Sequence, residues 1–344
     1  MILKRIASLD SEDAPLEMVD LPVPVPAANE VLVRVLACGV CHTELDEIEG
    51  RTAPPRYPVV PGHEIVGVIE EVGAEVPTRR VGERVGVGWI HHSDGSGEEN
   101  LSPAFRATGR DVNGGSAEYM TVPAGYAFPI PGVFSDAEAA PLLCAGAVGY
   151  RALRLTQLKN GERLGLMGFG GSAHIVLQLV RHLYPDSPVS VHARDAQARL
   201  YAMDLGADWA GDTGDPPPEK SAAVIDTTPV WGPVLCALET LRPGGRLVVN
   251  AIRKEDQDKE ALQGLSYRRH LWLEKEIKTV ANVTGRDIAE FLPLAAEIPI
   301  RPEVTAYPLD QANRALVELK RHPVRGAKVL VMSGGGNRGE GRKP

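Results

Sequence analysis

Residues 163–183 read RLGLMGFGGSAHIVLQLVRHL, and this stretch decides the fold of the second half of the chain. It begins with a short apolar run that has the length of a buried strand. It ends with Val176, Leu179 and Leu183, which recur at the spacing of one helix face. The glycine-rich turn Gly168–Ala173 lies between the two. A strand, a glycine turn and a helix in this order are the setting in which such a turn binds a dinucleotide.

The residues of the turn suit different parts of a dinucleotide site. Gly168 suits the tight turn, Gly170 lets backbone amides approach the pyrophosphate, and Ala173 permits close packing of the helix on the sheet. Gly171 and Ser172 complete the loop at the helix N-terminus, where the positive end of the dipole favours phosphate. The alternative is a structural turn in a chain with 36 glycines, but the flanking strand and helix favour the dinucleotide site.

The end of the second strand indicates which dinucleotide binds. An acidic residue at this place binds the ribose 2′-hydroxyl of NAD, whereas an arginine nearby accommodates the 2′-phosphate of NADP. This chain has Ala193 at the expected acidic position and Arg194 after it, which favours NADP(H) over NAD(H). The alternative is that Arg194 is a solvated surface residue and Asp195 a helix N-cap.

Strands and helices continue to alternate around this turn, which predicts a parallel, doubly wound sheet. The expected strands are residues 163–167, 189–193, 222–226, 246–252 and 278–283, and the expected helices are 176–183, 199–205, 231–241 and 287–296. Residues 242–245 are expected to form a turn.

Residues 1–146 are instead rich in Pro, Gly and Val. Short β-like runs such as Glu30–Val35, Ile65–Ile69 and Arg84–Val87 are separated by turn signals, which predicts an irregular, mostly antiparallel β domain. At the other end of the chain, the Gly-rich and charged tail Ser333–Pro344 is expected to be disordered.

Length and composition limit the classes of protein that this chain can be. Its 344 residues suit two domains. A net charge of -8 argues against a nucleic-acid partner, because too few cations are available for a run of phosphates. No stretch approaches the roughly 20 apolar residues of a membrane helix. The first residues become polar too early for a secretory signal, so we expect a cytoplasmic protein.

Four cysteines are present, and in a reducing compartment they are expected to be fillers, reactive thiols or metal ligands rather than disulfides. Two of them lie in strings with other metal-binding side chains. The strings are CGVCHTELD at residues 38–46, VPGHE at residues 60–64 and PLLCAG at residues 141–146. Together they offer two thiolates, an imidazole and a carboxylate, although each cysteine alone could be a buried filler.

These strings, in this order and followed by the dinucleotide turn, resemble the zinc-dependent alcohol dehydrogenases of the medium-chain dehydrogenase/reductase superfamily, up to about residue 332. The resemblance implies a GroES-like catalytic domain over residues 1–146 and 285–344 and a Rossmann domain over residues 147–284. It also implies hydride transfer between a primary or secondary alcohol, or its aldehyde or ketone, and NADP(H) or NAD(H).

The resemblance further implies that Cys41, His63 and Cys144 bind one catalytic zinc, with Glu64 as a fourth or exchanging ligand. Two cysteines and one histidine, with a fourth position left open for water or substrate, are the known ligand set of the catalytic zinc in alcohol dehydrogenases. By the same comparison Cys38 is a bystander. Cys236, in an expected helix, is a core filler.

The resemblance also assigns the residues that move the proton. Thr43 is similar to the hydroxyl that starts the family's relay through the cofactor ribose, and His42 to the residue near the pyrophosphate. Asp46 stands where many relatives have the histidine that ends the relay. Asp46 could act as a base or be a polar helix residue.

One element of the family is missing. Many members bind a second, structural zinc through four cysteines in a lobe, but the matching residues 89–102, WIHHSDGSGEENLS, contain no cysteine. We therefore expect no structural zinc. His91, His92 and Asp94 could form a substitute metal site, but a solvated polar loop is the better interpretation. This lobe borders the subunit contact in relatives, so their oligomeric state cannot be carried over to this chain. We expect a homo-oligomer, dimer or tetramer, only because most soluble oligomers are of this kind.

Two further departures concern the active site. Val148 stands where the family commonly has threonine near the nicotinamide, and residues 50–53 lack a tryptophan that narrows some small-alcohol pockets. With Trp89 as a pocket wall, we expect a roomier pocket for medium-chain or aromatic aldehydes. The alternatives are a zinc-free quinone or enoyl reductase of the same superfamily and a catalytically inactive nucleotide-binding relative.

Overall fold

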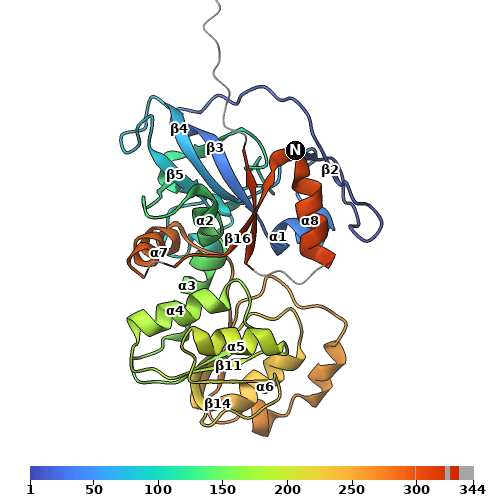
Figure 1. Cartoon of the computed structure of the whole chain (residues 1–344), viewed down its shortest axis with the longest axis vertical. Coiled ribbons are helices and arrows are strands. Elements are labelled where there is room, and N and C mark those ends of the chain that lie inside the picture. Colours follow the sequence, from blue (N-terminus) through green and yellow to red (C-terminus); the bar gives the residue numbers. More distant parts are fainter. Residues whose placement is uncertain (299, 322–325, 333–344) are drawn as a thin grey trace, which may run out of the picture. The chain divides into compact units, whose positions relative to one another are not determined.

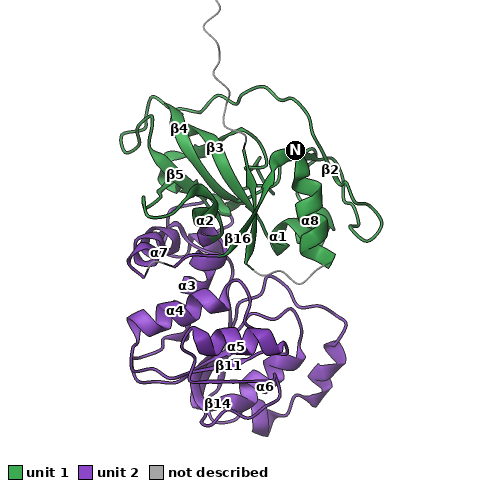
Figure 2. Ribbon diagram, viewed as in Figure 1, with its two compact units in different colours: residues 1–92, 106–141, 303–344 green, residues 93–105, 142–302 purple. Residues whose placement is uncertain are grey.

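The computed structural model describes residues 1–298, 300–321 and 326–332, so the predicted tail Ser333–Pro344 lies outside the described residues. The chain divides into two compact units (Figure 2). The first unit comprises residues 1–92, 106–141 and 303–344, and the second comprises residues 93–105 and 142–302.

The division lies close to the predicted domain boundaries at residues 146/147 and 284/285 but does not coincide with them. Helix α7 (Gly285–Glu297) packs in the second unit against α3 (Ala145–Thr156). Phe291 of α7 comes so close to Gly146 of α3 that a Cβ there would lie 2.4 Å from its ring. Because this packing joins the two helices, both belong to the unit that carries the parallel sheet.

The first unit is built around a seven-stranded sheet that is antiparallel except where its strands β16 and β17 pair. The strand order is β16-β17-β3-β4-β5-β9, with β8 also paired to β3. The bounds are β3 Glu30–Val40, β4 Glu64–Val72, β5 Arg84–Val87, β8 Tyr119–Pro123, β9 Phe128–Pro129, β16 Val304–Pro308 and β17 Ala327–Val331. Strands β3, β4 and β5 lie side by side in Figure 1.

Alternation along β3 explains the core of this unit. Val31, Val33 and Val35 are at most 1% exposed, and their branched side chains suit a pleated, buried face. Helices α1 (His42–Ile48) and α8 (Ala312–Arg321) pack on each other beside the sheet. The smaller elements are β1 Ile2–Leu3, β2 Leu16–Glu17, β6 Ile90–His92, β7 Arg106–Ala107 and α2 Asp136–Ala139. The predicted irregular, mostly antiparallel β domain is confirmed.

The second unit holds a six-stranded parallel sheet in the order β12-β11-β10-β13-β14-β15. Its strands are β10 Leu164–Met167, β11 Val189–His192, β12 Trp209–Gly211, β13 Ser221–Asp226, β14 Leu241–Val249 and β15 Glu276–Thr279. The other helices of the unit are α4 Ala173–Leu183, α5 Ala196–Asp204 and α6 Gly232–Thr240. This is the 3-2-1-4-5-6 order of a Rossmann fold, so the predicted fold class is confirmed. No helix in the described parts of the chain is long and apolar enough to cross a membrane.

Two strand boundaries lie four or more residues from their predicted positions. Strand β14 begins at Leu241 rather than after a turn, because the pairing register shifts between Ser221 and Ala223 and takes up residues 242–245 as a bulge. Strand β15 ends at Thr279, four residues before the predicted end, and Asn282 beyond it has a left-handed φ of 63°. A residue in that conformation cannot continue a strand.

Candidate functional site

The four predicted metal ligands lie together. Cys41, His63, Glu64 and Cys144 each offer one ligand atom, and these atoms lie within 4.8 Å of one another. Tetrahedral zinc, with bonds of about 2.3 Å to sulfur and about 2.0–2.1 Å to nitrogen, separates those two ligands by about 3.6 Å. The distance from Cys41 Sγ to His63 Nε2 is 3.6 Å. The donor set and its spacing therefore fit zinc.

The local structure explains how Cys41 is oriented. It is the N-cap of α1, directly after β3, and its Sγ accepts a hydrogen bond of 3.3 Å from the Thr43 amide. Glu44 completes a capping box by accepting from the Cys41 amide at 2.8 Å. The thiol is thus held at a helix N-terminus, where the dipole favours the thiolate.

Two glycines allow close packing around the candidate ligands, one beside Glu64 and the other beside Cys38. A Cβ at Gly39 would lie 1.8 Å from Glu64 Oε2, so only glycine admits this carboxylate beside β3. Gly62 has a φ of +100°, and a Cβ there would lie 2.7 Å from Cys38 Sγ. Cys38 itself is fully buried, as expected of a bystander.

Glu44 is a candidate functional residue that the sequence reasoning missed. Its Oε1 lies 2.5 Å from His63 Nδ1, and both side chains are buried. Burial alone raises the pKa of the Glu44 carboxyl, but His63 and the hydrogen bonds outweigh it and lower that pKa below its usual value. An anionic Glu44 holds the proton on Nδ1 and leaves Nε2 free to bind a metal. The spacing from Cys41 to Glu44, which matches a capping box, was the available signal.

The remaining predicted catalytic residues all lie on α1. His42 is exposed and Thr43 is half-buried. Asp46 is only 2% exposed and accepts a hydrogen bond of 2.6 Å from Arg51 Nε. This ion pair favours the interpretation of Asp46 as a polar helix residue.

Trp89, the expected pocket wall, is held beside the metal ligands. Its indole nitrogen donates to Glu47 Oε1 at 3.2 Å, and its ring meets the His63 ring edge-on at 6.4 Å between centroids. Glu47 is buried, and burial raises its pKa to about 8. Sequence reasoning did not single out Glu47.

The predicted dinucleotide turn has the expected backbone. Gly168 has a φ of +82°, and a Cβ there would lie 2.8 Å from Thr227 Oγ1. A Cβ at Gly170 would meet nothing within 4 Å, so its outer side is open to a ligand. The Ser172 hydroxyl donates to the Ala145 carbonyl at 2.7 Å and ties the loop to the start of α3. The two other loop residues that we predicted are Gly171, before Ser172, and the buried Ala173, which begins α4.

Arg194 follows the end of β11 and is exposed. Asp195 is the N-cap of α5 and accepts from the amides of Gln197 and Ala198, as the alternative interpretation expected. Arg199 donates to the carbonyls of Ala193 and Arg194 at 2.7 and 2.8 Å, which fixes the backbone below the Arg194 side chain.

The expectation of a solvated polar loop over residues 89–102 is wrong in part. His91 lies in β6, is 5% exposed and hydrogen-bonds the Thr121 carbonyl through Nε2 at 3.2 Å. Glu99 and Asn100 are also buried, whereas residues 94–98 are exposed. Long-range hydrogen bonds hold the buried residues, and such partners leave no trace in local polarity.

The sequence and the fold are similar to those of known alcohol dehydrogenases. The family model described as the alcohol dehydrogenase GroES-like domain matches residues 27–132. The chain is 44% identical over 341 residues to "Probable alcohol dehydrogenase AdhA" of Mycobacterium tuberculosis, with 96% of each chain covered. It is 32% identical over 343 residues to an alcohol dehydrogenase of Geobacillus stearothermophilus, covering 95% of this chain and 99% of the relative.

A solved structure shares the whole fold. A cinnamyl alcohol dehydrogenase from Sorghum bicolor has a TM-score of 0.79 at 25% identity, with 96% of this chain and 97% of that chain covered. Since the relatives match nearly the whole length, the resemblance drawn from the motifs is confirmed.

Proposed function

The chain belongs to the zinc-dependent alcohol dehydrogenases of the medium-chain dehydrogenase/reductase superfamily, and we propose that it uses one zinc per chain and prefers NADP(H). It is an alcohol dehydrogenase, or aldehyde reductase in the reverse direction, that transfers hydride between its substrate and a nicotinamide dinucleotide. Its partner is therefore a small alcohol or aldehyde.

The proposed zinc ligands are Cys41, His63 and Cys144, with Glu64 as the fourth or exchanging ligand. The 3.6 Å spacing of Cys41 Sγ and His63 Nε2 carries this proposal, and the Glu44 carboxylate behind His63 supports it. When bound, zinc supplies a Lewis acid that favours the alkoxide of an alcohol and polarises the carbonyl of an aldehyde. Within the described residues no second group of metal-binding side chains accompanies this one, and we propose that the lobe lacks a structural zinc.

The protein residues then handle the proton. We infer that the Thr43 hydroxyl accepts the proton of the alcohol and passes its own proton to the next group of the relay, because its amide bonds Cys41 Sγ and its side chain leaves α1 in the first turn. His42, exposed at the start of the same helix, is proposed to contact the pyrophosphate. Asp46 remains a candidate base at the end of the relay, although its ion pair with Arg51 supports a structural role.

The cofactor and substrate preferences rest on separate features. Gly168, Gly170, Gly171, Ser172 and Ala173 are proposed to hold the pyrophosphate. The exposed Arg194 after β11 supports binding of a 2′-phosphate. Medium-chain or aromatic aldehydes are the proposed substrates, and the similarity to a cinnamyl alcohol dehydrogenase supports the aromatic ones.

We also propose that the chain forms a homo-oligomer, dimer or tetramer. Strand β15 is the outer strand of its sheet and all four of its residues are exposed. Ile277 in this strand is 49% exposed, and Trp272 and Leu273 before it are each 51% exposed. An open strand edge with apolar neighbours can pair with a second copy.

Elemental analysis of protein purified without added metal tests the central proposal. We expect one zinc per chain, lost together with turnover in Cys41→Ala and Cys144→Ala but kept in Cys236→Ala, whose thiol lies in α6. NADP should support turnover with a higher kcat/KM than NAD. Two zinc ions per chain would contradict the interpretation of the lobe. Full NADPH oxidation without zinc would contradict the assigned metal site.

A further inference from the structure

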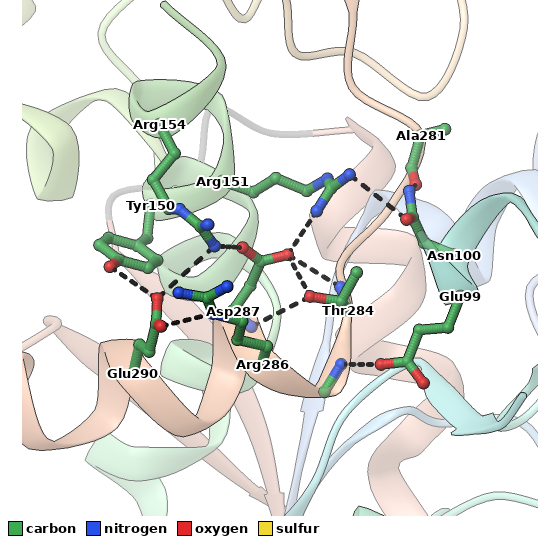
Figure 3. A network of polar contacts seen from close by, with 11 residues as sticks. Glu99, Asn100, Tyr150, Arg151, Arg154, Ala281, Thr284, Arg286, Asp287 and Glu290 are labelled. Carbon is green, nitrogen blue, oxygen red and sulfur yellow. Dashed lines mark hydrogen bonds and ion pairs between the residues drawn. The ribbon is translucent and has the colours of Figure 1, made fainter. Parts of the chain in front are cut away.

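Two buried polar residues near the end of the lobe, Glu99 and Asn100, have hydrogen-bond partners far away in the sequence. In the segment Ser93–Phe105, Glu99 is 5% and Asn100 is 8% exposed, while the preceding Glu98 is exposed. Figure 3 shows both side chains directed at the segment between β15 and α7. In a solvated polar loop, the side chains of Glu99 and Asn100 would stay in water, because burial of a polar group costs free energy unless a hydrogen bond compensates.

The two side chains hold the segment at both of its ends (Figure 3). Asn100 Nδ2 donates to the Ala281 carbonyl at 2.6 Å, and Glu99 Oε1 accepts from the Gly285 amide at 2.6 Å. Gly285 is the first residue of α7, so the Glu99 carboxylate also meets the positive end of the helix dipole. Residues 282–284 are therefore enclosed between two hydrogen bonds from the lobe.

The enclosed segment needs such support. Asn282 has a φ of 63°, a left-handed conformation that asparagine tolerates better than other non-glycine residues. Its Nδ2 is buried, and none of the described residues accepts a hydrogen bond from it. An unpaired buried donor opposes folding. The hydrogen bonds from Asn100 and Glu99 hold the two ends of this segment.

The lobe is joined to the start of α7 by a shared arginine. Arg151 of α3 donates to Asn100 Oδ1 at 3.3 Å and to Asp287 Oδ2 at 2.6 Å. Asp287 in turn forms a capping box with Thr284. The lobe, the helix cap and the intervening segment thus form one network, as Figure 3 shows.

The place of this segment in the sheet gives the network a consequence for binding. Ligands of an open parallel sheet bind beyond the carboxyl ends of the strands, and residues 280–284 follow the carboxyl end of β15. The turn after β10 and Arg194 after β11 belong to the adenosine half of the proposed site, so β13, β14 and β15 border the nicotinamide half.

We propose that Glu99 and Asn100 are positioning residues for the nicotinamide half of the dinucleotide site. They hold the segment after β15 in its bound shape through hydrogen bonds, in a lobe without cysteines. This inference rests on the proposed function, because it requires that the sheet bind the dinucleotide.

The test compares two ligands that differ only in the nicotinamide. Dissociation constants for NADP and for 2′-phospho-ADP-ribose are measured on the full chain and on Asn100→Ala, Glu99→Gln and Glu98→Gln. If NAD is the preferred cofactor, NAD and ADP-ribose replace this pair. Loss of the hydrogen bond to Ala281 in Asn100→Ala, and loss of the negative charge at the start of α7 in Glu99→Gln, should each weaken NADP binding on the order of threefold to tenfold. Binding of 2′-phospho-ADP-ribose, and both affinities of the exposed control Glu98→Gln, should stay unchanged.

A second measurement needs no ligand. Hydrogen exchange of the peptide over residues 281–285 should be faster in Asn100→Ala and Glu99→Gln than in the full chain or in Glu98→Gln. Unchanged exchange, or equal weakening of both ligands, would overturn the inference. A full chain that binds neither ligand would overturn the proposed function and the inference with it. Normal binding by the full chain and by all variants would overturn the inference alone.

Discussion

At the scale of single residues, His63 shows how the metal site is prepared. One ring nitrogen lies 2.5 Å from Glu44 Oε1 and the other 3.6 Å from Cys41 Sγ. The contact with Glu44 keeps the proton on Nδ1, and Nε2 faces Cys41 Sγ at the proposed metal position. The ring can therefore bind zinc without first reorienting.

Glu44→Gln should keep the shape of this contact but remove its charge. We expect zinc affinity to fall roughly 10–100-fold, as when the hydrogen-bond partner of a metal-binding histidine is lost. Competition with a chelator of known affinity measures the change. The matched control is Glu47→Gln, a buried glutamate on the same helix whose Oε1 accepts from Trp89. Equal zinc affinities of both variants and the wild type would show that the Glu44 charge is irrelevant.

Arg194 decides the cofactor in our proposal. Arg194→Ala removes a cation that can form charge-assisted hydrogen bonds with the 2′-phosphate. We expect kcat/KM for NADP to fall on the order of 10-fold to 100-fold, with kcat/KM for NAD unchanged. Steady-state kinetics with both cofactors at one substrate concentration measure this. A parallel loss with NAD would mean that Arg194 acts on the fold and not on the phosphate.

At the scale of elements, the start of α7 depends on a buried carboxylate. Asp287 is fully buried and accepts hydrogen bonds of 2.6 and 2.7 Å from Arg151 and Arg154 of α3. It also closes the capping box of its own helix with Thr284. One side chain thus begins α7 and joins it to the helix that follows Cys144.

Asp287→Ala should destabilise the chain by roughly 1–3 kcal/mol, because it removes the capping box of α7 and leaves the partly buried Arg151 without its carboxylate partner. Denaturant unfolding at neutral pH measures this loss of free energy. The exposed Asp204 of α5 provides a control, and Asp204→Ala should change the free energy of unfolding much less. Similar losses in both variants would contradict the importance of the buried contact.

The same carboxylate predicts a pH dependence. Burial alone raises the pKa of Asp287, but hydrogen bonds from Thr284 and Arg151 outweigh it and lower the pKa below its usual value. A lowered pKa in the folded state stabilises the chain above the unfolded-state pKa of about 3.9. The stabilisation is lost as the pH falls from there through the folded-state pKa. Unfolding measured from neutral pH down to pH values below about 3.9 should show an acid loss that Asp287→Asn lacks.

At the scale of the whole molecule, the exposed edge of β15 is the feature that points to association. Its neighbours Trp272 and Leu273 are each half exposed, an arrangement that monomers rarely keep on an open strand. We expect Ile277→Glu to shift the chain from an oligomer toward the monomer in sedimentation velocity. Leu200→Glu, at a 58% exposed position of α5, is the control and should leave the mass unchanged. A monomeric wild type would refute the oligomer itself.

Most of the architecture could be predicted because its signals are local. The glycine turn Gly168–Ala173 lies between its strand and its helix within one short stretch, and apolar periodicity identifies both. The boundaries that failed, at the start of β14 and the end of β15, depend on a bulge and on one left-handed residue. Backbone geometry of that kind has no periodic pattern in the sequence.

Short strings of residues were enough to predict the family, the Rossmann and β-domain fold class, and the four candidate metal ligands. The path of the folded chain, by contrast, brings Glu44 to His63, Arg51 to Asp46, and Asn100 of the lobe to the Ala281 carbonyl. Asn100 and Ala281 are 181 residues apart in the chain, yet they share a hydrogen bond of 2.6 Å. Such partners are chosen by the path of the folded chain, because a buried polar group must find its hydrogen bond wherever the fold brings one.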